Sequence, residues 1–125
     1  MANPNIVNVT SILGESTYLT PSDTAANVLL ANATSSGKVY KINQIVAANV
    51  DGASAVNTTV AINTTAAGGG TSYPIVSTVS VPADASLIVT DKTTAIYLME
   101  NKSIVVTSGT ASKIAYTISY EVIED

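Results

Sequence analysis

Large apolar residues recur at every second position over much of this chain. The clearest run is residues 113–123, in which alternate positions hold Ile114, Tyr116, Ile118, Tyr120 and Val122. Successive side chains of a β-strand point to opposite faces, so this spacing is typical of a strand with one buried face. The segment 56–63 alternates similarly, and both segments are rich in β-branched residues, which favour strands over helices.

The same reasoning predicts nine strands separated by short turns. Their expected ranges are 5–13, 24–33, 39–50, 56–63, 73–81, 87–90, 95–99, 103–107 and 113–123. Gly14-Glu15 is expected to be a turn, and Asp51-Gly52 is a cue for a type I′ hairpin. Ala66 to Gly70 reads as a flexible loop, because a phosphate-binding loop would need a lysine after its glycines. Many short strands without helices predict an all-β fold, a single antiparallel β-sandwich or jelly roll over residues 1–125.

The N-terminal segment, residues 1–13, has two interpretations. Its apolar alternation fits the first strand of the domain's own sheet. It also fits an extended arm that adds a strand to the sheet of a neighbouring subunit. The sequence alone leaves both open.

Composition narrows the function. The chain has 125 residues and no histidine or cysteine, and it also contains no arginine. Most general bases, thiol nucleophiles and phosphate-binding forks are therefore missing, so we expect no enzyme and no cofactor. Five lysines against nine acids give a net charge of −4, which is unsuited to nucleic acid. Only 11% of residues are charged, so the surface has few charges that would oppose association with other subunits.

Location can also be inferred from the sequence. The first residues show no signal peptide, and no apolar run is long enough to span a bilayer, so we expect synthesis in the cytoplasm and no membrane. The N-glycosylation triplets that begin at Asn8, Asn32, Asn57, Asn63 and Asn101 are then the chance product of a chain rich in asparagine, serine and threonine.

The acidic residues offer two weak candidate sites. Asp51, Asp84 and Asp91 fall in expected turns, where carboxylates cap the backbone more often than they bind Ca²⁺. A hydrolase would need paired carboxylates with separate roles, and nothing in the sequence brings Glu15, Glu100 and Glu121 together. We expect neither a metal nor a catalytic site.

Exposed apolar residues are better candidates, as a partner interface. The six tyrosines are Tyr18, Tyr40, Tyr73, Tyr97, Tyr116 and Tyr120, of which the last two lie on the apolar face of their strand. Tyr73-Pro74, beside the glycine loop, is the pair most expected at a surface, where tyrosine anchors interfaces or stacks on sugars. Ile6, Val7 and Val9 are the corresponding candidates in the N-terminal segment.

Several strand and turn segments resemble small virion structural proteins of tailed phages that infect cyanobacteria and marine bacteria. The similar segments are residues 3–10 (NPNIVNVT), 37–42 (GKVYKI), 48–52 (ANVDG), 81–85 (VPADA), 96–98 (IYL) and 119–121 (SYE). They span nearly the whole chain and contain no catalytic or ligand motif.

The resemblance implies a role in the virion. Among such proteins, an acidic and compact β module most resembles a capsid decoration (cement) protein, which sits outside the shell and braces neighbouring capsomers. The resemblance thus implies homo-oligomers, trimers among them, that contact the major capsid protein. The alternative is a neck, tail or fibre subunit with a structural or host-binding role.

Overall fold

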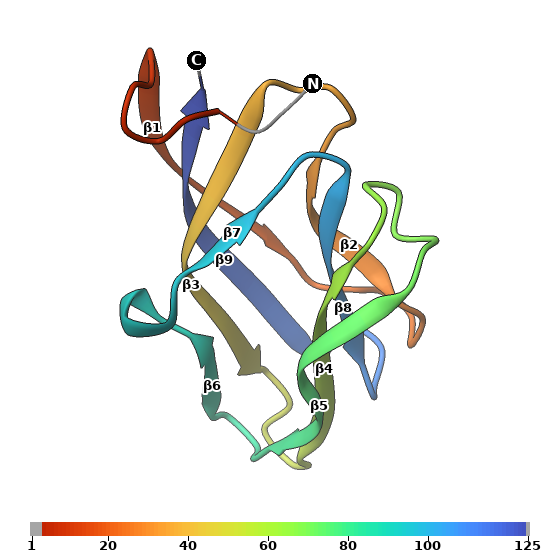
Figure 1. Ribbon diagram of the computed structural model, residues 1–125. Helices are drawn as coiled ribbons and strands as arrows, with labels where there is room; N and C mark the ends of the chain where they lie inside the picture. Colours follow the sequence, from red (N-terminus) through yellow and green to blue (C-terminus); the bar gives the residue numbers. More distant parts are fainter. Residues whose placement is uncertain (1–3, 125) are drawn as a thin grey trace.

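Two antiparallel β-sheets pack face to face in the computed structural model, which describes residues 4–124 (Figure 1). The first sheet has the order β1-β9-β3-β6, with β7 pairing β3, and the second has the order β2-β8-β4-β5. The strands are β1 (Ser11–Leu19), β2 (Asn27–Asn32), β3 (Lys38–Asn49), β4 (Val56–Asn63), β5 (Ser72–Val81), β6 (Ser86–Thr90), β7 (Ile96–Leu98), β8 (Lys102–Ser108) and β9 (Ile114–Glu124). The predicted all-β sandwich is confirmed.

Within residues 4–124 the helical structure is one 3-10 turn, η1 (Lys92–Thr94), and no helix there has the length and apolarity to cross a membrane. All strand pairs are antiparallel, yet most connections leave one sheet and enter the other. Residues distant in sequence therefore become neighbours, as in the pairing of β1 with β9.

The first strand differs from its predicted range of 5–13. β1 begins at Ser11 and continues to Leu19, so the predicted turn at Gly14-Glu15 is wrong. Both residues lie within the strand, where Gly14 is opposite Glu121 and Glu15 is opposite Tyr120. A long β9 offers an uninterrupted row of backbone partners, and this pairing overrides the local turn preference of a glycine followed by a polar residue.

The predicted type I′ hairpin at Asp51-Gly52 is also wrong. This segment connects β3 in one sheet to β4 in the other, and neither residue has positive φ. The Asp51 carboxylate instead accepts hydrogen bonds from the backbone N–H groups of Ala53 and Ser54, at 2.9 and 3.2 Å. The bend is thus formed by an aspartate side chain rather than by a hairpin.

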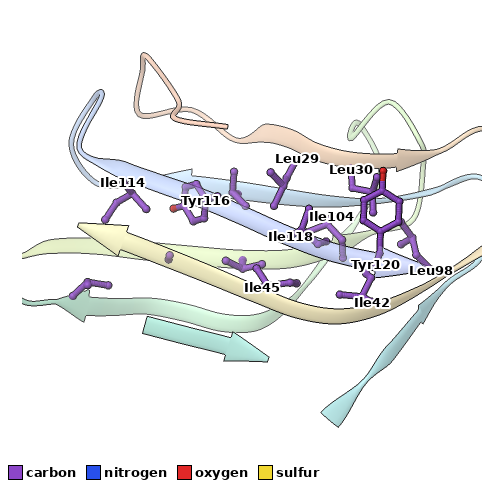
Figure 2. Close-up of a cluster of buried hydrophobic side chains, with 14 of the residues drawn as sticks. Leu29, Leu30, Ile42, Ile45, Leu98, Ile104, Ile114, Tyr116, Ile118 and Tyr120 are labelled. Atoms are coloured by element: carbon purple, nitrogen blue, oxygen red, sulfur yellow. The ribbon is translucent and has the colours of Figure 1, made fainter. Parts of the chain in front are cut away.

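Aliphatic side chains and two tyrosines fill the space between the sheets (Figure 2). The predicted inward face of β9 is confirmed, with every residue buried: Ile114, Tyr116, Ile118, Tyr120 and Val122. Ile42 and Ile45 from β3 and Ile104 from β8 complete the centre of the core. Branched aliphatic residues pack densely between sheets about 10 Å apart, so the core forms without phenylalanine or tryptophan.

Three consecutive strands end at a buried asparagine: Asn32 in β2, Asn49 in β3 and Asn63 in β4. Each side chain holds the chain that leaves its strand. The Asn49 Nδ2 donates to the carbonyl oxygens of Ser54 and Val81, at 3.0 and 2.9 Å. Because Asn32 and Asn63 are at most 1% exposed, their glycosylation triplets cannot be acceptors in the folded chain.

The glycine-rich loop is tied down rather than free. Asn63 Oδ1 accepts from the N–H groups of Thr65 and Gly70, both at 3.0 Å. Gly68 has φ of +83°, and a Cβ there would lie 2.9 Å from the Val28 side chain. The expected flexible loop therefore folds back against the outer face of the second sheet.

Candidate functional site

An apolar surface lies where the N-terminal segment meets β1. Ile6 is 51% exposed and Val7 is 90% exposed, whereas Val9 is half-buried. Ile12 and Leu13, which follow in β1, are also more than half exposed. We call Ile6, Val7, Ile12 and Leu13 the N-terminal patch. It contains two of the three residues expected from the sequence, Ile6 and Val7, and adds two that were assigned only to a strand.

The segment before β1 is partly docked on the chain's own first sheet. Pro4 is buried, and the N–H of Thr10 donates to the carbonyl oxygen of Glu124 at 2.9 Å. Val39 and Ile123 are register partners that are buried outside the main core cluster, on the outer face of this sheet. Residues 11–13 therefore belong to the domain's own sheet, and Ile6 and Val7 are the exposed apolar residues before it.

The second predicted group lies elsewhere. Tyr73 is 62% exposed and Pro74 is also exposed, both on β5. β5 is an edge strand of the second sheet, whereas β1 is an edge strand of the first, and the contacts of β1 with β2 and of β5 with β6 put them at opposite sides of the sandwich. The sequence-predicted residues thus form two separate surfaces and not one site.

The remaining tyrosines divide between core and surface. Tyr116 and Tyr120 are buried as predicted, and the Tyr120 ring lies 5.2 Å from that of Tyr40. The Tyr120 hydroxyl donates to Glu15 Oε2 at 3.0 Å. Burial, this hydrogen bond and the neighbouring negative charge all favour the neutral phenol and raise the pKa of Tyr120 to about 12. Tyr18, on β1, is 80% exposed.

Two of the three turn aspartates, Asp51 and Asp91, act as backbone caps. Asp91 accepts from the N–H and the hydroxyl of Thr93, at 3.0 and 2.6 Å, and so begins η1. The Thr93 hydroxyl is the main cause of the lowered pKa of Asp91, and the N–H of Ala53 is the main cause of the lowered pKa of Asp51. Within residues 4–124, no cluster of three or more acidic, cysteine or histidine side chains is arranged to hold a metal.

A polar groove, which sequence reasoning missed, crosses the outer face of the first sheet. It consists of two adjoining hollows of about 560 and 320 Å³ that share Asn43 and Ser119. The other lining residues are Gln44, Asp91, Lys92, Thr93, Gly14, Glu15, Ser16, Tyr120 and Glu121. The pairing register of β3 with β9 shifts between Ile42 and Gln44, which places the groove at a bulge. Only a break in the alternation at Asn43-Gln44 could have signalled it.

Two of the three glutamates considered for hydrolysis line this groove but do not pair, because Glu15 is opposite Tyr120 and Glu121 is opposite Gly14, so their side chains point to opposite faces of the sheet. Glu15 accepts from the Tyr120 hydroxyl, and Glu121 Oε1 accepts from Asn43 Nδ2 at 3.4 Å. Glu100 lies in the turn between β7 and β8, apart from them. The two carboxylates serve as hydrogen-bond acceptors that join side chains of neighbouring strands.

Comparison with known proteins gives a fold but no family. No family model matches the chain, and no curated protein is similar to it in sequence. Among solved structures, a subunit of Bacillus endospore appendages, described as disulfide-linked pili, has a TM-score of 0.50 at 14% identity, covering 99% of this chain and 96% of that one. At this identity the likeness shows a shared β-sandwich fold.

Two viral structures are more distant. A protein of infectious bursal disease virus, Gx strain, has a TM-score of 0.44 at 9% identity, covering 90% of this chain and 33% of that one. A chain of the cyanophage Pam1 capsid has a TM-score of 0.40 at 10% identity, covering 100% of this chain and 93% of that one.

Proposed function

We propose that this chain is a non-enzymatic structural subunit of a phage virion, a capsid decoration protein that assembles with copies of itself on the outer shell and contacts the major capsid protein. The observation that carries the proposal is the pair of exposed apolar surfaces at opposite edges of one small sandwich, the N-terminal patch and Tyr73-Pro74. A subunit with two separate contact surfaces can bind a neighbour and a support at once.

The charge and the resemblance support the same location. A net charge of −4 suits the outside of a shell better than a surface that faces packaged DNA. The segments 37–42 and 81–85, which resemble virion proteins, form the start of β3 and the turn before β6. These segments form a strand and a turn rather than a ligand site, as expected for a structural subunit.

The strand order supports a finer description, a jelly roll. Without the three-residue β7, each sheet alternates strands from the two halves of the chain, as two Greek keys wound together would do. Jelly rolls occur in viral capsid and lectin domains, among others, so the fold fits the proposal without deciding it.

The pilus subunit with this fold belongs to a disulfide-linked polymer. The present chain has no cysteine, so its own assembly rests on packing and hydrogen bonds. Repetition on a lattice can give such weak contacts a high total strength.

The experiment is a rebinding assay with phage heads that lack the protein. We expect purified chain to bind intact heads and to raise the temperature at which they rupture. Binding to tails alone, with no effect on the heads, would contradict the proposal.

A neck, tail or fibre subunit is the second candidate. The observation that favours it is the polar groove on the first sheet together with the exposed Tyr73, because hydroxyl-rich host glycans are bound by such amides, hydroxyls and aromatic rings. Loss of binding to host cells in Tyr73→Ala, with heads still unbound, would favour this candidate over the capsid role.

A further inference from the structure

Within residues 4–124 the two sheets have five edge strands, β1, β2, β5, β6 and β7, and all but β1 are unsuited to pairing with another chain. β5 contains Pro74, two register shifts against β4, and Thr78 with φ of +51°. β2 has six residues and a register shift, β6 has only five residues and β7 only three. Short length, bulges and proline are the ordinary means by which proteins protect sheet edges.

β1 has none of these protections. It runs for nine residues, Ser11–Leu19, and pairs with β9 in one unbroken register. Its sequence contains no proline and no lysine, and its one charged residue, Glu15, is engaged by the Tyr120 hydroxyl. The outer side of β1 therefore presents a straight row of backbone donors and acceptors about 30 Å long, at roughly 3.3 Å for each residue.

The N-terminal patch lies at the start of this edge. Ile12 and Leu13 point to opposite faces of β1 and are 54% and 53% exposed. Ile6 and Val7 are exposed just before them. A partner strand laid along the edge would cover apolar side chains on both faces of the sheet, in addition to pairing the backbone.

We propose that β1 pairs antiparallel with β1 of a second copy of this chain, and joins the two first sheets into one continuous sheet. Two copies of one edge form an isologous contact, which gives a dimer with a twofold axis. We place the axis near Ile12 and Leu13, because the patches of both copies then meet. An axis at Glu15 would set two carboxylates directly opposite each other, which is unfavourable.

The area of the paired edge indicates how strong the contact between the two copies is. An axis near Ile12 and Leu13 pairs about four residues of each β1, an edge roughly 13 Å long and roughly 10 Å thick, which covers only about 130 Å² on each copy, against the ~800 Å² of a stable interface. The added patch increases this area, but the dimer in solution should still be weak and depend on concentration. Such a weak contact suits a subunit that is also held by a capsid lattice. The biological role of this dimer rests on the proposed function as a decoration protein.

The first test uses charge at the axis. In Ile12→Lys and in Ile12→Glu, like charges meet across the axis, and each variant should raise the dimer dissociation constant about fivefold or more, as measured by sedimentation. An equimolar mixture of the two should restore the dimer, because opposite charges then meet. Ile88→Lys, an equally exposed isoleucine (58%) on β6, is the matched control and should leave the dimer unchanged. Equal dimerisation of all variants would overturn the proposal.

The second test uses the absence of cysteine from the chain. Directly opposed residues in antiparallel strands have Cα atoms about 4.5–5.5 Å apart, within disulfide range. Under mild oxidation, Leu13→Cys or Ile12→Cys should cross-link to its own copy. Tyr18→Cys lies about 40 Å from its copy in this register and should not, nor should Ser77→Cys on β5. Cross-linking that is strongest at position 18 or 77 would contradict the β1 pairing.

These tests use purified chain alone, so they are independent of the capsid role. A dimer that fails to bind heads would leave the pairing standing and reject the decoration proposal. Head binding by a chain that stays monomeric at every concentration, with no cross-link through β1, would reject the pairing and assign the edge to the capsid protein.

Discussion

The hydroxyl of Tyr116, in the first sheet, donates a hydrogen bond to the carbonyl oxygen of Thr107, in the second, at 3.0 Å. The same hydroxyl is hydrogen-bonded to the side chain of Thr58, which is also buried. One phenol therefore joins two strands of the facing sheet inside the core. Burial raises the pKa of Tyr116, and the bond to Thr58 opposes that shift.

Tyr116→Phe should lower the free energy of unfolding by about 1–3 kcal/mol, because it leaves the Thr107 carbonyl without this donor and the buried Thr58 hydroxyl without this acceptor. Chemical denaturation in urea measures the change. Tyr97→Phe is the control, since Tyr97 is 46% exposed on β7 and its substitution should cost less than about 0.5 kcal/mol. An equal effect of both substitutions would show that the inter-sheet bond contributes nothing specific.

Alkaline pH should destabilise the fold through Tyr120. Its pKa is about 12 in the folded chain, against roughly 10 for an unfolded tyrosine, so the unfolded state binds fewer protons between these values. The contribution is constant below about pH 10 and is lost as the pH rises towards 12. The melting temperature of Tyr120→Phe should therefore fall less steeply between about pH 10 and 12 than that of the unsubstituted chain. Both chains contain the same lysines, so lysine titration contributes equally to the two curves. Identical slopes would contradict the assigned burial and contact with Glu15.

Asn49→Ala should destabilise the chain by about 2–3 kcal/mol. The substitution removes bonds to the carbonyl oxygens of Ser54 and Val81, and the buried Val81 carbonyl loses this donor. Asn57→Ala, at an exposed position of β4, is the control and should change stability by less than about 0.5 kcal/mol. Thermal unfolding followed by circular dichroism would distinguish them.

Gly68→Ala should cost about 1–3 kcal/mol, because a Cβ would lie 2.9 Å from Val28 and φ is positive. Its neighbour supplies a matched control, since a Cβ on Gly69 has no atom within 4 Å. Gly69→Ala should be neutral or slightly stabilising. Proteolysis of the loop offers a second measurement: only Gly68→Ala should increase cleavage there.

Much of the fold could be predicted from local pattern. The inward face of β9 followed from its alternation, and the strands after residue 24 lie close to their expected ranges. The first strand could not be placed, because its bounds are set by pairing with β9 at the other end of the chain. Strand order was equally inaccessible, since the pairs join residues far apart in sequence.

The candidate surfaces were predicted only in part, because some of them depend on how distant strands come together. The exposure of Tyr73 could be expected because it follows the glycine-rich loop, and that of Val7 because it lies near the start of the sequence. The polar groove depends on a bulge that brings Asn43 beside Ser119, and single residues of these types carry no signal. The roles of Asn32, Asn49 and Asn63 were likewise hidden, because asparagine is frequent throughout the chain.

We propose above that this sandwich is a structural subunit on the outside of a phage capsid. Cryo-electron microscopy of an intact particle that contains the chain tests it most directly. We expect density for the two-sheet module over the outer shell, in hundreds of copies. Density confined to the neck, tail or fibres, in a few dozen copies or fewer, would contradict it.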